Sequence, residues 1–215
     1  MGIGYFLETV MIRAALVTML FSCVALAQDP AVAGLKAGDA VPETFRAFLA
    51  ADSRFEKDSP KNRAKKMHDL VTDNGLNPVL VAFVRSVPAA DTPAAKLARR
   101  MSELVETYKP ERLGGFMIFL TLDKEYQQEE NRDPKAKAAE DLSAQLQSGN
   151  VPFGLAAKES AATKAWGLSD KDEIVVVYYN RLRVQKVWSF AADKLTDEEI
   201  KAIGTYVNGE LKSKR

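Results

Sequence analysis

Residues 78–84 read Pro78-Val79-Leu80-Val81-Ala82-Phe83-Val84, a run in which odd and even positions alike are apolar. Side chains alternate between the two faces of a strand, so a continuous apolar run predicts a strand that is buried on both faces. Strands of this kind lie in the middle of a parallel sheet covered by helices on both sides. The run therefore predicts an α/β fold built around a central sheet.

Downstream of this run, helical patterns alternate with short apolar segments. Helices are expected over residues 94–108, 136–146 and 161–166, and strands over residues 115–122 and 151–157. Residues 174–179 and 184–190 predict an antiparallel hairpin around Asn180-Arg181, and Thr196 caps a final helix. Helices between strands imply right-handed parallel crossovers. The order predicts a three-layer α/β domain with a mixed sheet of about five strands and helices on both faces.

The start of the chain has the plan of a secretory signal peptide. Arg13 precedes an apolar core over residues 14–27 that ends in Ala25-Leu26-Ala27, the small residues expected at a cleavage site. The core is shorter than the ~20 residues that cross a bilayer as a helix. Because Glu8 is an acid where positive charge belongs, we expect translation to start at Met11.

We therefore expect a signal peptide over residues 1–27, a loose tail over 28–37 and one domain over 38–215. The protein is expected to be periplasmic or extracellular, without stable membrane insertion after processing. Two alternatives remain open. The apolar core could be a retained membrane anchor, or Cys23 could be lipidated, although the bulky Phe21 argues against a lipidation site.

Composition excludes several kinds of chemistry. The only cysteine is Cys23, so a chain cleaved after Ala27 holds no thiol and forms no disulfide. The only histidine is His68, which argues against zinc or copper and leaves only oxygen-ligand metals conceivable. We expect no metal and no cofactor. With 30 basic and 29 acidic residues, charge gives no reason to expect nucleic acid as a partner.

Several short motifs, taken in order, carry a resemblance to a known family. They are Gly38-Asp39-Ala40-Val41-Pro42 with Phe45 beyond it, Lys66-Met67-His68-Asp69-Leu70 before the central run, Trp166-Gly167 in a short helical segment, and the hairpin over 174–184. Together they resemble the alkyl hydroperoxide reductase and thiol-specific antioxidant branch of the thioredoxin superfamily, also called peroxiredoxin-like. The resemblance spans about residues 38–211 and implies a thioredoxin-like fold.

The resemblance also indicates where the reactive cysteine of that family would stand. After the first core strand the family places a proline, a threonine four residues on and the peroxidatic cysteine three further. Here the corresponding residues are Pro88, Thr92 and Ala95. A methyl group cannot replace a thiolate as nucleophile, so the resemblance implies a vacated catalytic position. A chance match in this Pro- and Ala-rich loop is the alternative, and it leaves the absence of a thiol unchanged.

For the other groups of polar, aromatic or charged residues, a structural role is favoured over a functional one. His68 and Asp69 could form an acid–base pair, but neighbouring side chains point in different directions and no nucleophile is tied to them. Residues 129–133 lack the spacing of a calcium loop and are expected to be a solvated loop. Trp166, Tyr178, Tyr179 and Trp188 could form a binding surface, although core positions are favoured. The basic residues Lys61, Arg63, Lys65 and Lys66 predict a solvated face.

The expected function is that of a redox-silent, thioredoxin-like module that binds another protein or a small ligand. A competing hypothesis is a divergent enzyme that uses carboxylate or histidine chemistry, with Asp69 and His68 as candidates, in the former redox cleft. A third is a scaffold without a ligand. Fold alone does not decide among them.

Overall fold

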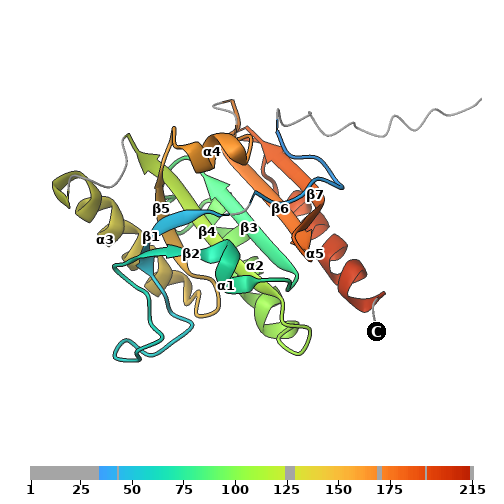
Figure 1. The fold of residues 1–215 in the computed structure, drawn as a ribbon, viewed down its shortest axis with the longest axis horizontal. Helices are drawn as coiled ribbons and strands as arrows, with labels where there is room; N and C mark the ends of the chain where they lie inside the picture. The colour runs from blue at the N-terminus through green and yellow to red at the C-terminus, as the bar shows by residue number, and fades with distance from the viewer. Residues whose placement is uncertain (1–33, 43, 124–128, 169–170, 192, 214–215) are drawn as a thin grey trace, which may run out of the picture.

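Among the residues that the structure describes, seven strands form one mixed sheet in the order β2-β1-β5-β4-β3-β6-β7 (Figure 1). The computed structural model describes residues 34–213 apart from 43, 124–128, 169–170 and 192. The strands are β1 (Arg46–Ala51), β2 (Met67–Asp69), β3 (Val79–Val84), β4 (Gly114–Leu122), β5 (Phe153–Ala157), β6 (Ile174–Asn180) and β7 (Arg183–Phe190). The α/β class with a mixed sheet is confirmed, but the expected number of about five strands is wrong.

The two unforeseen strands are β1 and β2. Half of the residues of β1 are alanine, which has a low preference for strands, and β2 has only three residues. They pair antiparallel with each other, Ala47 facing His68, and β1 then pairs antiparallel with β5, Phe48 facing Leu155. The segment that precedes the central run therefore extends one edge of the sheet.

The centre of the sheet agrees with the prediction from the central apolar run. Strand β3 lies parallel to β4, and β4 lies parallel to β5. On its other side β3 pairs antiparallel with β6, which continues into the antiparallel β7. Helices connect the parallel strands, as the alternation of patterns indicated.

Helices cover both faces of the sheet. They are α1 (Leu70–Asn74), α2 (Pro93–Thr107), α3 (Glu129–Leu146), α4 (Ala161–Ala165) and α5 (Asp197–Lys212). Leu80 and Ala82 of β3 are buried in the cluster formed with α2, α3 and α5, whereas Val79 and Val81 are buried in the cluster formed with α1 and α4. Alternate residues of one strand thus enter two cores, which is why the run is apolar throughout.

Several boundaries differ from the expectations. Helix α3 begins at Glu129, so residues 129–133 form its first turn rather than a loop. The residue after α3, Gln147, is left-handed, with φ 51°, although it is not a glycine. The hairpin turns at Arg181 and Leu182, whose φ angles are 52° and 55°. Two left-handed residues match the twist of the flanking strands even without glycine.

The aromatic residues considered as a binding surface belong to the core. Trp166, Tyr178 and Tyr179 are fully buried, and Trp188 is almost fully buried. The Trp166 ring packs against Phe83, with 5.2 Å between ring centroids. The core interpretation of these residues is confirmed.

The predicted signal peptide, including Met11, Cys23 and Ala27, lies outside the described residues. The described chain begins at residue 34, and Leu35 is already buried in the cluster shared with α1 and α4. The last residues assigned to the loose tail therefore contact the core. Across the part of the chain that the structure describes, no helix is long and apolar enough to span a bilayer.

Candidate functional site

The position that the resemblance assigns to a reactive cysteine lies at the start of α2, just after β3. Thr92 is the N-cap of this helix, and its hydroxyl oxygen accepts a hydrogen bond from the Ala95 amide at 3.4 Å. The same hydroxyl donates to the Ala89 carbonyl at 2.8 Å. Pro88 lies half-buried in the loop between β3 and α2. Thr92 and Ala95 therefore meet as a capping pair, in the sequence order that was expected.

Ala95 itself is fully buried in the core between α2 and the sheet. Its methyl group offers neither a lone pair nor a proton, and the hydroxyl nearest to its amide is already engaged in capping. The start of α2 thus supplies helix-terminating interactions and packing. It presents no nucleophile at residue 95.

The weak candidate Asp69 is fixed in a structural role. It is the N-cap of α1, where one carboxylate oxygen accepts hydrogen bonds from the amides of Val71 at 3.1 Å and Thr72 at 3.4 Å. The same oxygen accepts from the Phe45 amide at 3.2 Å, and the other accepts from the Thr72 hydroxyl at 2.6 Å. A carboxylate that satisfies four donors holds the entry of α1 and the start of β1 together.

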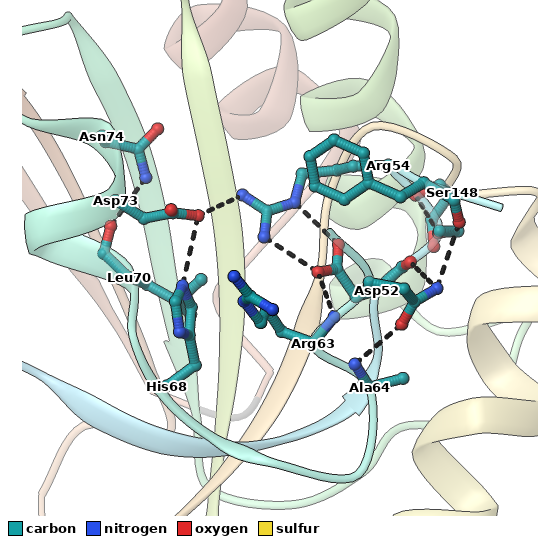
Figure 2. A network of polar contacts seen from close by, with 12 residues as sticks. Asp52, Arg54, Arg63, Ala64, His68, Leu70, Asp73, Asn74 and Ser148 are labelled. Atoms are coloured by element: carbon teal, nitrogen blue, oxygen red, sulfur yellow. Dashed lines mark hydrogen bonds and ion pairs between the residues drawn. The ribbon is translucent and has the colours of Figure 1, made fainter. Parts of the chain in front are cut away.

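The other weak candidate, His68, does not pair with Asp69. The two residues are neighbours on β2, so their side chains leave the strand on opposite faces. His68 instead places Nε2 3.4 Å from a carboxylate oxygen of Asp73 (Figure 2). The acid–base pair considered from the sequence is therefore replaced by a His68–Asp73 contact at the edge of a larger network.

That network is centred on Arg54, which the sequence did not single out. Its guanidinium bonds both carboxylate oxygens of Asp52, at 2.7 and 3.0 Å, and reaches Asp73 at 2.8 Å (Figure 2). Burial works against the charge of Arg54, but the hydrogen bonds to Asp52 and Asp73 outweigh it and raise the pKa of the guanidinium above its ordinary value. The network joins the end of β1, the edge strand β2 and α1.

Asp52 also organises the loop between β1 and β2, residues 52–66. Its side chain is fully buried and accepts a further hydrogen bond from the Arg63 amide at 3.2 Å. The Asn62 side chain donates to the carbonyls of Asp52 and Phe55, both at 3.1 Å. The Ser53 hydroxyl donates to the Ser148 carbonyl at 3.2 Å, just beyond the end of α3. The stretch is therefore a folded loop, and Lys61, Lys65 and Lys66 on it are exposed, as expected for a solvated face.

A cleft of about 700 Å³ opens between this loop and the C-terminal part of α3, and we call it the β1–β2 cleft. Its lining includes Phe55, Lys57 and Lys66 from the loop and Glu140 and Ala144 from the helix. Two of the four basic residues predicted to form a solvated face, Lys65 and Lys66, line it, and Lys57 joins them. The volume lies in the range of small-molecule binding pockets.

No cluster of three or more potential metal-ligating His, Cys, Asp or Glu side chains occurs within the described ranges. The carboxylates of Asp52 and Asp73 are both engaged with Arg54. This charge pairing stabilises the loop.

Comparisons with known proteins were made on sequence and on structure. No protein family and no curated protein matches the sequence. Mycobacterium tuberculosis AhpC superposes with a TM-score of 0.55 at 14% identity, covering 82% of this chain and 95% of that one. The thiol peroxidase of Chromobacterium violaceum superposes with a TM-score of 0.55 at 12% identity, covering 84% and 90%.

The chain has a thioredoxin-like fold. A Chlorobium tepidum protein assigned as the thiol:disulfide interchange protein DsbE also superposes with a TM-score of 0.55, at 14% identity, covering 83% of this chain and 99% of that one. The predicted resemblance to the thioredoxin superfamily is confirmed at the level of the fold. AhpC and a thiol peroxidase are among the matched structures, as expected for a peroxiredoxin-like branch.

Proposed function

We propose that this protein is an exported thioredoxin-like module that carries out no thiol chemistry and acts by binding. The observation that supports this most directly is Ala95, a buried methyl group in the first turn of α2. Thiol peroxidases and disulfide oxidoreductases act through a thiolate. The only cysteine of the chain is Cys23, inside the segment that we expect to be removed on export.

The binding role is supported by the β1–β2 cleft. One of its walls is a loop held by a buried carboxylate and by the Asn62 side chain, so contacts within the protein maintain the shape of the cleft. Preformed concave sites of this size are characteristic of small-molecule binding. An enzyme based on His68 and Asp69 receives less support, because Asp69 already satisfies its hydrogen bonds as a helix cap.

The mature protein, isolated from the compartment to which it is exported, tests the first part of the proposal. Intact mass should match a chain that begins at Gln28. Rates of insulin disulfide reduction and of hydroperoxide consumption should equal those of buffer. A turnover that survives removal of contaminating enzymes would overturn the thiol-free assignment.

Binding is tested separately, by comparing what the wild-type protein and an Ala144→Trp variant retain from an extract of the same compartment. Ala144 is an exposed residue of α3 that lines the cleft, so a tryptophan there should obstruct the cleft without disturbing the core. A molecule retained by the wild type and lost from the variant supports the proposal. Identical retention by both proteins contradicts a role for the cleft.

A further inference from the structure

The β1–β2 cleft lies far from the position where a redox site would be. Strand β1 meets the beginning of β5, since Ala51 pairs with Phe153, and the cleft opens beyond this point. Helix α2 starts after the end of β3, and β3, β4 and β5 run parallel. The cleft and the start of α2 are therefore at opposite ends of the parallel strands.

The loop wall of the cleft is held in place at several points. At the base, Asp52 is anchored by Arg54 and by the Arg63 amide. Asn62 spans the loop, and its Oδ1 also accepts a hydrogen bond from the Ala64 amide at 2.8 Å. Ser53 ties the loop to Ser148, two residues beyond the end of α3. The backbone of this wall is consequently held in place along the cleft.

The charges that line the cleft do not balance. Of its two carboxylates, Asp52 is neutralised by Arg54. The other, Glu140, lies 3.9 Å from the ammonium of Lys65, and both side chains are largely exposed, so the attraction is weak. Lys57 and Lys66 make no side-chain hydrogen bond or ion pair with other described residues. Among the described residues, these two lysines therefore line the cleft without an ion-pair partner.

The rest of the lining includes apolar surface. Ala50 and Ala51 at the end of β1, Phe55 of the loop and Ala144 of α3 contribute to it. The volume of about 700 Å³ is far larger than an inorganic anion needs. A ligand that fits this lining combines one or two negative charges with an apolar body, because each part then meets its complement.

We propose that the β1–β2 cleft binds a small organic anion, a carboxylate or a phosphate ester with an apolar body, through Lys57 and Lys66. The inference rests on the proposed binding function and adds the chemical class of the ligand. The apolar body packs against Phe55 and Ala144, and the anionic group lies between the two ammonium groups.

Two fluorescent probes of similar shape test this. Anilinonaphthalene sulfonate is an organic anion, and N-phenylnaphthylamine has the same aromatic body without the charge. The Lys57→Gln/Lys66→Gln variant should bind the sulfonate about 25-fold more weakly, since each charge contact in water is worth about a fivefold change in affinity and two contacts are removed. Its affinity for the neutral probe should be unchanged. Circular dichroism confirms that the variant is folded.

A Lys164→Gln/Lys201→Gln variant is the matched control, because it removes two exposed lysines that do not line the cleft. It should retain wild-type affinity for the sulfonate. An equal loss in both variants would mean attraction by net charge alone, and no loss in the Lys57→Gln/Lys66→Gln variant would mean binding elsewhere. Either result overturns the proposed anion site. The insulin-reduction and hydroperoxide assays test the absence of thiol chemistry independently of this outcome.

Competition distinguishes the two sources of negative charge. Isophthalate and phenyl phosphate are added against the bound sulfonate probe, with inorganic phosphate as the reference. Displacement by one of the organic anions at concentrations where inorganic phosphate has no effect supports the proposal and identifies the preferred group. If neither isophthalate nor phenyl phosphate displaces the probe, or if inorganic phosphate displaces it equally well, the result contradicts an organic anion site.

Discussion

The buried carboxylate of Asp52 provides the sharpest test of how the loop between β1 and β2 is held. Replacing Asp52 by asparagine keeps the shape of the side chain and removes its charge. The guanidinium of Arg54, whose side chain is only 20% exposed, then faces an amide where two carboxylate oxygens stood at 2.7 and 3.0 Å. The amide NH₂ of the asparagine is itself a hydrogen-bond donor, so it would face the N–H donors of the guanidinium.

The size of the effect follows from the contacts. Removing one partner of a buried ion pair costs about 3 to 5 kcal/mol, because the other charge stays buried without compensation. Arg54 retains Asp73 at 2.8 Å, which offsets part of this cost. We expect Asp52→Asn to lower the free energy of unfolding by about 2 to 3 kcal/mol, or the melting temperature by roughly 4 to 12 °C.

Urea denaturation followed by circular dichroism measures the change. Asp123→Asn is the matched control, because Asp123 forms an ion pair with Lys158 at 2.9 Å on the surface, and its stability should equal that of the wild type. An Asp52→Asn/Arg54→Met variant should be more stable than the sum of the two single changes predicts, since it leaves no buried charge unpaired. A stability of Asp52→Asn within about 0.5 kcal/mol of the wild type would refute the reasoning.

Three further predictions concern the cores and the start of α2. A thiol introduced by Ala95→Cys should react with iodoacetamide only when the protein unfolds, because residue 95 is fully buried. A thiol from Ala89→Cys, in the exposed loop before α2, should react at once, and equal rates for the two variants would contradict the burial of residue 95. Burial, and to a smaller extent the charge of Asp69, raises the pKa of Tyr179, so the folded state keeps this proton while the unfolded state loses it above about pH 10. The contribution of Tyr179 to stability should therefore be constant below that pH and fall above it, and denaturation at pH 11 should show a smaller loss of stability for Tyr179→Phe than for the wild type. Gly154→Ala should lower stability by about 1 to 3 kcal/mol, because the added Cβ would lie 2.9 Å from Ile118 Cδ1, whereas Gly149→Ala, with nothing within 4 Å, should be neutral in the same urea titration.

The parts of the fold that could be predicted are those whose signal is local. The run over residues 78–84 is apolar at every position because both its faces are buried, and the structure agrees. Thr196 precedes its helix as a cap and accepts a hydrogen bond from the Glu199 amide at 3.3 Å. Strand β1 gave no comparable signal, because its alanine-rich sequence fits a helix as well as a strand.

The polar network could not be predicted because its members are distant in sequence. Asp52 and Arg54 are close along the chain, but their relation to Asp73 and His68 depends on the pairing of β1 with β2, which the sequence does not reveal. Asp69 precedes the apolar pair Leu70 and Val71, and its carboxylate accepts a hydrogen bond from the hydroxyl of Thr72, three residues later. Interpreting Asp69 as a helix cap would have argued against an acid–base pair with His68 from the sequence alone.

The pairing of β1 with β5 has a consequence for how the chain folds. Phe48 meets Leu155 only after most of the chain is available, and Val79 of the central strand likewise meets Tyr179. Contacts between residues so distant in sequence carry a high cost of loop closure and make folding slow. The β1–β2 pair can form early because its strands are close in sequence, but it joins the sheet only when β5 is available, and β3 gains its second neighbour only when β6 has been synthesised.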